Sequence, residues 1–207
     1  MTESGIDSGD ATPVAAPNPF AMMFGALFAP VETFGKAAQR PVWAVPMILY
    51  VLLSIVGTVL VMPKIDFESV VREQMEKRGQ QIDDKQLEML VSIQKPVIYV
   101  SSVVVIPIGI LIIAAVNMGG FRAFGGGGRF AQYFSVTTLA WMPLLIQSLV
   151  GQAVILTRRS ISIEQIQTAV MSNLGFLTSP LDNPARFALL SSIDLFSIWV
   201  LVLLVIG

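Results

Sequence analysis

The chain lacks two side chains on which much enzyme chemistry depends. Its 207 residues include no cysteine and no histidine. These absences exclude disulfides, thiolate metal sites, cysteine nucleophiles and imidazole acid–base catalysis. We therefore expect no catalytic site, no cofactor and no metal ion, and we predict that the protein is not an enzyme.

Charge is also scarce. Only 13% of the residues are charged, 54% are hydrophobic, and the mean hydropathy is +0.73. Soluble domains carry about 25% charged residues, so this composition indicates a membrane protein. The net charge of -1 gives no basic surface for nucleic acid, and we expect the partners to be the lipid bilayer and other membrane proteins, with a homo-oligomer as a further option.

Four apolar runs are each long enough to cross about 30 Å of hydrocarbon as a helix. We therefore predict an all-α, multi-pass integral membrane protein, and Pro107 and Pro143 should kink the second and third spans. The predicted spans are residues 42–62, 97–118, 133–156 and 187–207.

Residues 1–18 are polar and small, and we expect a disordered tail ahead of a membrane domain at 19–207. Hydrophobic residues then recur at helical spacing from Phe20 to Phe34, which predicts an amphipathic helix broken near Pro30. Two interpretations stay open: this helix lies in the membrane interface, or it packs against the transmembrane bundle.

The connection at 64–95 holds mixed charges and two amphipathic stretches. It predicts two short helices, the first ended by Gly79 and the second capped by Asp83 or Asp84. This hairpin is either a solvated element on the membrane surface or a docking surface for a partner. The later connection, 157–186, has room for one short helix in its middle.

A glycine-rich stretch, "FRAFGGGGRF", follows the second span. A phosphate-binding P-loop needs a lysine and a hydroxyl after its glycines, and neither is present. The looser dinucleotide pattern requires a preceding strand, whereas a transmembrane helix precedes it here. We interpret the stretch as an interfacial turn, formed by Arg122, Gly125, Gly126, Gly127, Gly128 and Arg129.

Asp194 is the one charged residue inside a predicted span, and an acid at that depth is a candidate functional residue. Three roles stay open: a packing acid hydrogen-bonded to neighbouring helices, a proton or cation site, and a side chain that reaches the interface. The residues that could share an intramembrane polar site with it are Ser191, Ser197, Asn117, Gln147 and Gln152.

Three stretches together resemble the Yip domain family, the Ypt/Rab-interacting membrane proteins, in a prokaryotic-type member. They are "LFAPVETF" before the first span, "GGGGRFAQYFSVTTLAWMPLL" around the third, and "LLSSIDLFSIWVLVLLVIG" at the end. "REQMEKRGQQI" in the first connection also looks like bacterial members. The resemblance covers about residues 20–207.

The resemblance implies a polytopic helical protein with about five spans, a cytoplasmic N-terminus and no catalytic residues. The sequence has four apolar runs, and its raw count of basic residues favours an N-terminus outside. Most of those residues lie in the long connection of mixed charge, so we discount the count and expect the family's orientation, with the N-terminus inside. By resemblance we expect a scaffold, assembly or trafficking-type factor that works through protein contacts in the membrane and accompanies an ABC-type efflux system. The alternative is a small transporter or channel that uses Asp194 and the kinked helices. The plasma or inner membrane is the expected location for a prokaryotic member.

Overall fold

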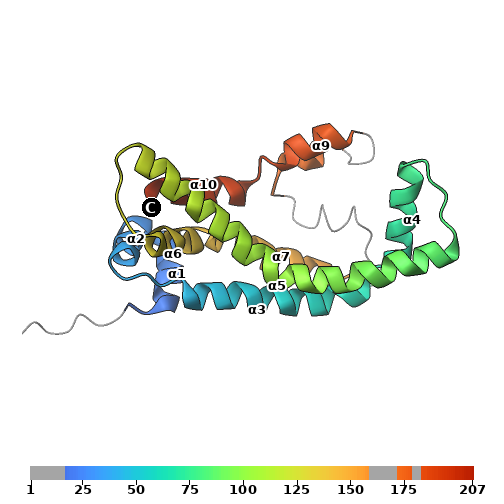
Figure 1. The fold of residues 1–207 in the computed structure, drawn as a ribbon, viewed down its shortest axis with the longest axis horizontal. Coiled ribbons are helices and arrows are strands. Elements are labelled where there is room, and N and C mark those ends of the chain that lie inside the picture. The colour runs from blue at the N-terminus through green and yellow to red at the C-terminus, as the bar shows by residue number, and fades with distance from the viewer. Residues whose placement is uncertain (1–16, 159–171, 179–182) are drawn as a thin grey trace, which may run out of the picture.

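The computed structural model describes residues 17–158, 172–178 and 183–207, and within them the chain is helical without strands. The predicted tail at 1–18 falls almost entirely outside the described residues, as does the middle of the connection at 157–186. The molecule is elongated, and its longest helices run along its length (Figure 1). In chain order the elements are α1 (Pro19–Phe28), α2 (Pro30–Gln39), α3 (Ala44–Val61), η1 (Met62–Lys64), α4 (Phe67–Lys77), α5 (Asp84–Ala123), α6 (Phe130–Ala140), α7 (Met142–Leu156), η2 (Leu174–Leu177), α9 (Pro184–Ser191) and α10 (Leu195–Ile206).

Three helical stretches of the described chain are long and apolar enough to cross a membrane: Ala44–Lys64, Asp84–Ala123 and Phe130–Leu156. They contain the second and third predicted spans and all but the first two residues of the first. The fourth predicted span, 187–207, is not one helix, because α9 ends at Ser191 and α10 begins at Leu195. With 12 residues, α10 is about 18 Å long, which is too short to cross the hydrocarbon core.

The N-terminal helices pack against the bundle. Asn18 caps α1 by accepting from the backbone N–H of Phe20 at 3.0 Å, and Pro30 occupies the first turn of α2. The helices share one buried core with α3, α5, α6, α7 and α10, to which they contribute Met22, Met23, Ala26, Phe34 and Ala37. A separate row of α1 phenylalanines, Phe20, Phe24 and Phe28, stays exposed. The buried side of α1 and α2 therefore packs against the transmembrane bundle, as one of the two interpretations expected.

Buried polar groups hold α6 against its neighbours. The Tyr50 hydroxyl on α3 donates to the backbone carbonyl of Thr138 at 2.9 Å. The backbone N–H of Val42 donates to Ser135 Oγ at 2.9 Å. Trp43 and Phe134 add a tilted ring contact at 5.3 Å. These contacts fix the N-terminal end of α3 on α6, since a buried polar group without a partner is destabilising.

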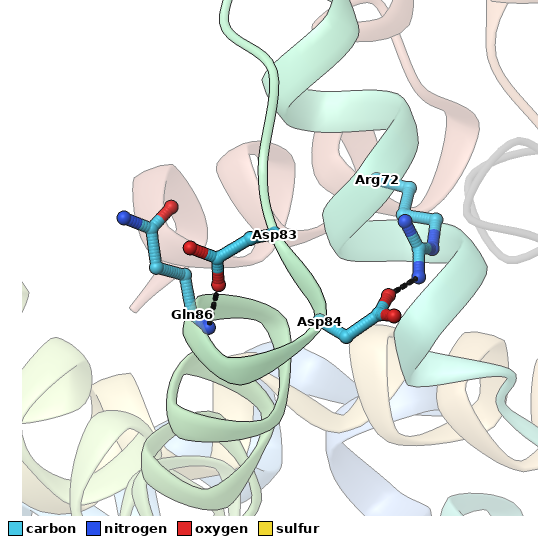
Figure 2. Close-up of polar contacts among 4 residues, drawn as sticks. All are labelled: Arg72, Asp83, Asp84 and Gln86. Carbon is cyan, nitrogen blue, oxygen red and sulfur yellow. Dashed lines mark hydrogen bonds and ion pairs between the residues drawn. The ribbon is translucent and has the colours of Figure 1, made fainter.

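The extramembrane hairpin consists of α4 and the start of α5. Gly79 follows α4 with φ of 69°, a left-handed conformation that favours glycine at a helix end. Asp83 accepts from the backbone N–H of Gln86 at 2.7 Å and caps α5, and Arg72 reaches across to Asp84 at 2.7 Å (Figure 2). The predicted end of the first hairpin helix at Gly79 and the predicted cap of the second at Asp83 are thus confirmed.

The second hairpin helix does not stop at the membrane. It continues into the second predicted span as α5, a single helix of 40 residues with Pro96 and Pro107 inside it. Figure 1 shows α5 changing direction along its length. In the third predicted span, α6 ends at Ala140 and α7 begins at Met142, so Pro143 stands in the first turn of a new helix. There its missing N–H leaves no helical bond unmade.

Candidate functional site: the helix break at Asp194

The break between α9 and α10 is organised by Asp194. Its Oδ2 accepts from the backbone N–H of Ser197 at 2.9 Å and caps the start of α10. A carboxylate at this position satisfies an otherwise unpaired backbone donor and complements the positive end of the helix dipole. The local sequence therefore favours a helix start here, even though the surrounding run is apolar.

The other carboxylate oxygen of Asp194 connects two further segments. Oδ1 accepts from Gln147 Nε2 of α7 at 3.0 Å and from the hydroxyl of Ser172. Gln147 Nε2 also lies 3.0 Å from Ser172 Oγ. We call Asp194, Gln147 and Ser172 the Asp194 node.

Backbone contacts tie the segment before η2 to the same break. The N–H of Leu195 donates to the carbonyl of Ser172 at 3.0 Å, and the N–H of Leu174 donates to the carbonyl of Ile193 at 3.3 Å. Together they form an isolated antiparallel bridge between Asn173 and Asp194. The segment at 172–177 is thus held to the start of α10 by both main-chain and side-chain bonds.

The Asp194 carboxylate is 4% exposed and receives three donors from the protein itself. Buried charge is tolerated when it is hydrogen-bonded in this way. The described residues contain no group of three His, Cys, Asp or Glu side chains that could hold a metal ion. The Asp194 node therefore holds three segments together by hydrogen bonds at the point where the helix is broken.

The structure separates the residues expected to share a site with Asp194. Gln147 joins it through its side chain, and Ser197 joins through its backbone N–H. The Ser191 hydroxyl is buried without a hydrogen-bond partner among the described residues, packed closely against Gly175. Gln152 donates to Ser148 at 3.0 Å and lies against Gly57, while Asn117 lines a different pocket.

Ser172 is the member of the node that the sequence did not indicate. It stands in a polar connection, 22 residues before Asp194. Serine is common in such connections, so nothing in its sequence context distinguishes it.

The glycine-rich turn is built around its own backbone. Gly125 and Gly128 have φ of 84° and 119°, and the Gly126 N–H donates to the carbonyl of Phe121 at 2.7 Å. A Cβ on Gly126 would lie 2.7 Å from that carbonyl oxygen. Three of the four glycines are thus required by the geometry of the turn.

Side chains from the two flanking helices close this turn. Tyr133 donates to the carbonyl of Gly127 at 2.6 Å, and Arg122 donates to the carbonyl of Gly128 at 3.2 Å. The Arg129 N–H in turn donates to Gln132 Oε1 at 2.6 Å. The Arg122 guanidinium is thus directed at a carbonyl of the turn, which agrees with the interpretation as a connecting turn.

Comparison with known proteins gives a family and no individual relative. The model of the Yip1 domain matches residues 24–207, which is nearly the whole chain. Neither the curated proteins nor the solved structures include one that matches it.

Proposed function

Because the chain belongs to the Yip1 domain family and is a membrane protein with several apolar helices, we propose that it is a non-enzymatic scaffold or assembly factor. It acts through protein–protein contacts in and beside the membrane. The family resemblance suggests an ABC-type efflux system as the class of partner.

The observation that carries this proposal is the continuity of α5. A helix of 40 residues is about 60 Å long, twice the thickness of the hydrocarbon core. A large part of α5 therefore extends beyond the apolar layer and carries α4 with it. A partner bound to this hairpin is connected to the membrane bundle through one uninterrupted helix.

The hairpin is packed firmly enough to serve as such a platform. Phe67, Val71 and Leu87 are buried between α4 and α5. Lys95 lies over the ring of Phe67 with its Nζ 5.6 Å from the ring centre. The Arg72–Asp84 ion pair is exposed, so it contributes at most about 1 kcal/mol and mainly sets the register of the two helices.

The outer side of the hairpin offers a contact point. Met89 and Ile93 are 56% and 55% exposed and stand one turn apart on α5. They lie among charged and polar residues, before the apolar stretch begins. Exposed apolar residues with a polar rim are typical of protein contact surfaces.

Site-specific photo-crosslinking in native membranes tests the proposal. A photoreactive residue at Met89 should give an adduct with one defined membrane protein that also co-purifies in mild detergent. A matched probe at Val105, which is 62% exposed inside the apolar stretch, should give mainly lipid adducts. Purification of the chain alone from several native sources, with no protein adduct from Met89, would contradict the proposal.

The transporter alternative gains less support from the geometry. All three described contacts of the Asp194 carboxylate are with protein donors, whereas a transport site needs groups that a substrate or ion can engage. Reconstitution in liposomes separates the two functions. A flux that Asp194→Asn abolishes would favour the transporter function. Absence of flux with the wild-type protein would exclude the transporter function.

A further inference from the structure

A second site lies under the glycine-rich turn, away from the Asp194 node. It is a pocket of about 240 Å³ between α5, α6 and α10 at the end of the molecule where α2 also lies (Figure 1). Its walls include Asn117 and Phe121 from α5, Val136 and Thr137 from α6, and Leu204 from α10. Gly127 and Gly128 form part of its rim.

Thr137 is the most informative wall residue. Its side chain is 1% exposed, and its hydroxyl has no hydrogen-bond partner in the part of the chain that the structure describes. Its neighbour Thr138 is equally buried but donates to the carbonyl of Phe134 at 2.6 Å. A buried polar group without a partner is unfavourable, so the Thr137 hydroxyl is poised to bond a group that enters the pocket.

Asn117 provides a second free donor. Its side chain is half-buried on the facing wall, and it makes no hydrogen bond within the described residues. The rim carbonyls of Gly127 and Gly128, by contrast, already accept from Tyr133 and Arg122. The wall side chains without a hydrogen-bond partner are thus the Thr137 hydroxyl and the Asn117 amide, and each of them can donate a hydrogen bond to a ligand.

The remaining wall defines the body of the ligand. Phe121, Val136 and Leu204 are apolar, and no charged side chain lines the pocket. The other polar side chains of the wall, Gln132 and Tyr133, already donate to the backbone carbonyls of Ala38 and Gly127. A charged headgroup or free phosphate therefore finds no counter-charge inside. The complementary ligand has an uncharged acceptor attached to an apolar chain.

The depth of the donors narrows the choice of ligand. Arg122 and Arg129 flank the turn at the headgroup level expected for basic residues. Thr137 stands about 12 Å along α6 from Arg129, and Asn117 about 7.5 Å along α5 from Arg122. The headgroup and interfacial layer is about 5–8 Å thick on each side of the hydrocarbon core. Asn117 therefore lies near its inner edge, where ester-linked lipids have their carbonyl groups, and Thr137 lies a few ångströms deeper.

We propose that this pocket binds the glycerol-ester segment of a diacyl membrane lipid. Thr137 and Asn117 donate to an ester carbonyl, and one acyl chain follows the apolar wall of Phe121, Val136 and Leu204. The bound lipid contacts α5, α6 and α10 beside the turn. This proposal does not depend on the proposed scaffold role.

Thermal unfolding of the purified full-length chain in detergent tests this. Dioleoylphosphatidylcholine and dioleoylglycerol should each raise the Tm by several degrees in a concentration-dependent way, because a ligand that binds only the folded state stabilises it. The dialkyl ether analogue of the phosphatidylcholine, which has no ester carbonyl, should give less than half that shift.

Three variants connect the shift to the pocket. Thr137→Val removes the hydroxyl at nearly constant shape, so its lipid-free Tm should equal or exceed that of the wild type while the ester-dependent shift is lost. Thr137→Ser keeps a hydroxyl and should keep the shift. The matched control Thr138→Val loses a satisfied bond, so its Tm should fall while its shift stays intact.

Four results would overturn the proposal. The first is no shift with any lipid, and the second is an equal shift with the ether analogue. The third is a full shift in Thr137→Val. The fourth is a shift with phosphatidylcholine but not with dioleoylglycerol, which would place the binding on the headgroup and outside this pocket.

Discussion

Replacement of Asp194 by alanine should destabilise the folded bundle by about 2–4 kcal/mol. The variant loses the N-cap of α10, which contributes about 1 kcal/mol. It also removes the acceptor of the Ser172 hydroxyl and one of the two acceptors of the Gln147 amide nitrogen. Side-chain hydrogen bonds inside membrane proteins contribute about 0.6–1.7 kcal/mol each, which accounts for the rest.

Asp194→Asn should cost less, about 1–2 kcal/mol. Asparagine is an equally good N-cap, and its single side-chain oxygen can keep either the Ser197 N–H or the Gln147 and Ser172 donors, but not all three. The amide nitrogen of the asparagine is itself a donor, and it would lie opposite groups that also donate, so no hydrogen bond forms between them. The order alanine, asparagine, wild type in rising stability is therefore specific to an acceptor role.

Unfolding in mixed micelles with rising SDS mole fraction, followed by far-ultraviolet circular dichroism, measures these differences. Ser191→Ala is the matched control, because the Ser191 hydroxyl is buried near the same break without a partner among the described residues. It should stay within about 0.5 kcal/mol of the wild type. If Asp194→Ala also stays within about 0.5 kcal/mol, the node does not hold the break together and the reasoning is refuted.

Three further changes test the turn, the core and the hairpin. Gly128→Ala should destabilise by about 1–2 kcal/mol in the same assay because φ is 119° there, whereas Gly127→Ala, with open space around it, should be nearly neutral; equal effects would argue against a geometric role for the glycines. Tyr50→Phe should cost about 1 kcal/mol through the lost bond to the Thr138 carbonyl, and an unchanged unfolding midpoint would contradict this. The hydrogen bonds from Ser69 hold the pKa of Asp66 below its usual 3.8. The Asp66 carboxylate therefore stabilises α4 above pH 3.8, and this stabilisation is lost as the pH falls through the lowered pKa. Asp66→Asn keeps the N-cap and should remove this acid dependence of helicity.

The helical membrane architecture follows from the sequence because few alternatives exist. A charge-free run of about 20 residues in lipid must satisfy its own backbone, and only a helix does so within one segment. The first three predicted spans therefore coincide with helical stretches, apart from two residues at the start of the first. Helix continuity is a separate matter: Lys95 ends the polar connection at 64–95, but it does not end a helix, and α5 passes through it without interruption.

The helix break in the fourth apolar run is hidden when hydropathy is averaged over the whole run. Hydropathy over 187–207 is that of a span, yet Ser192 and Asp194 are residues whose side chains compete for backbone donors and favour caps. The cap prevails here because Ser172 and Gln147 hold the carboxylate from two other segments. Those partners lie far away in sequence, so only the assembled structure could bring them together.

The pocket under the turn shows why one site was accessible to sequence reasoning and another was not. Four consecutive glycines attract attention in any sequence, and positive φ angles or close contacts explain three of them as parts of a turn. Thr137 and Thr138 are adjacent and of the same residue type, and a helical threonine usually bonds the carbonyl one turn before it. Thr138 does so and Thr137 does not. The unsatisfied hydroxyl, and with it the proposed lipid site, is a property of the packed helices and has no counterpart in the order of the residues.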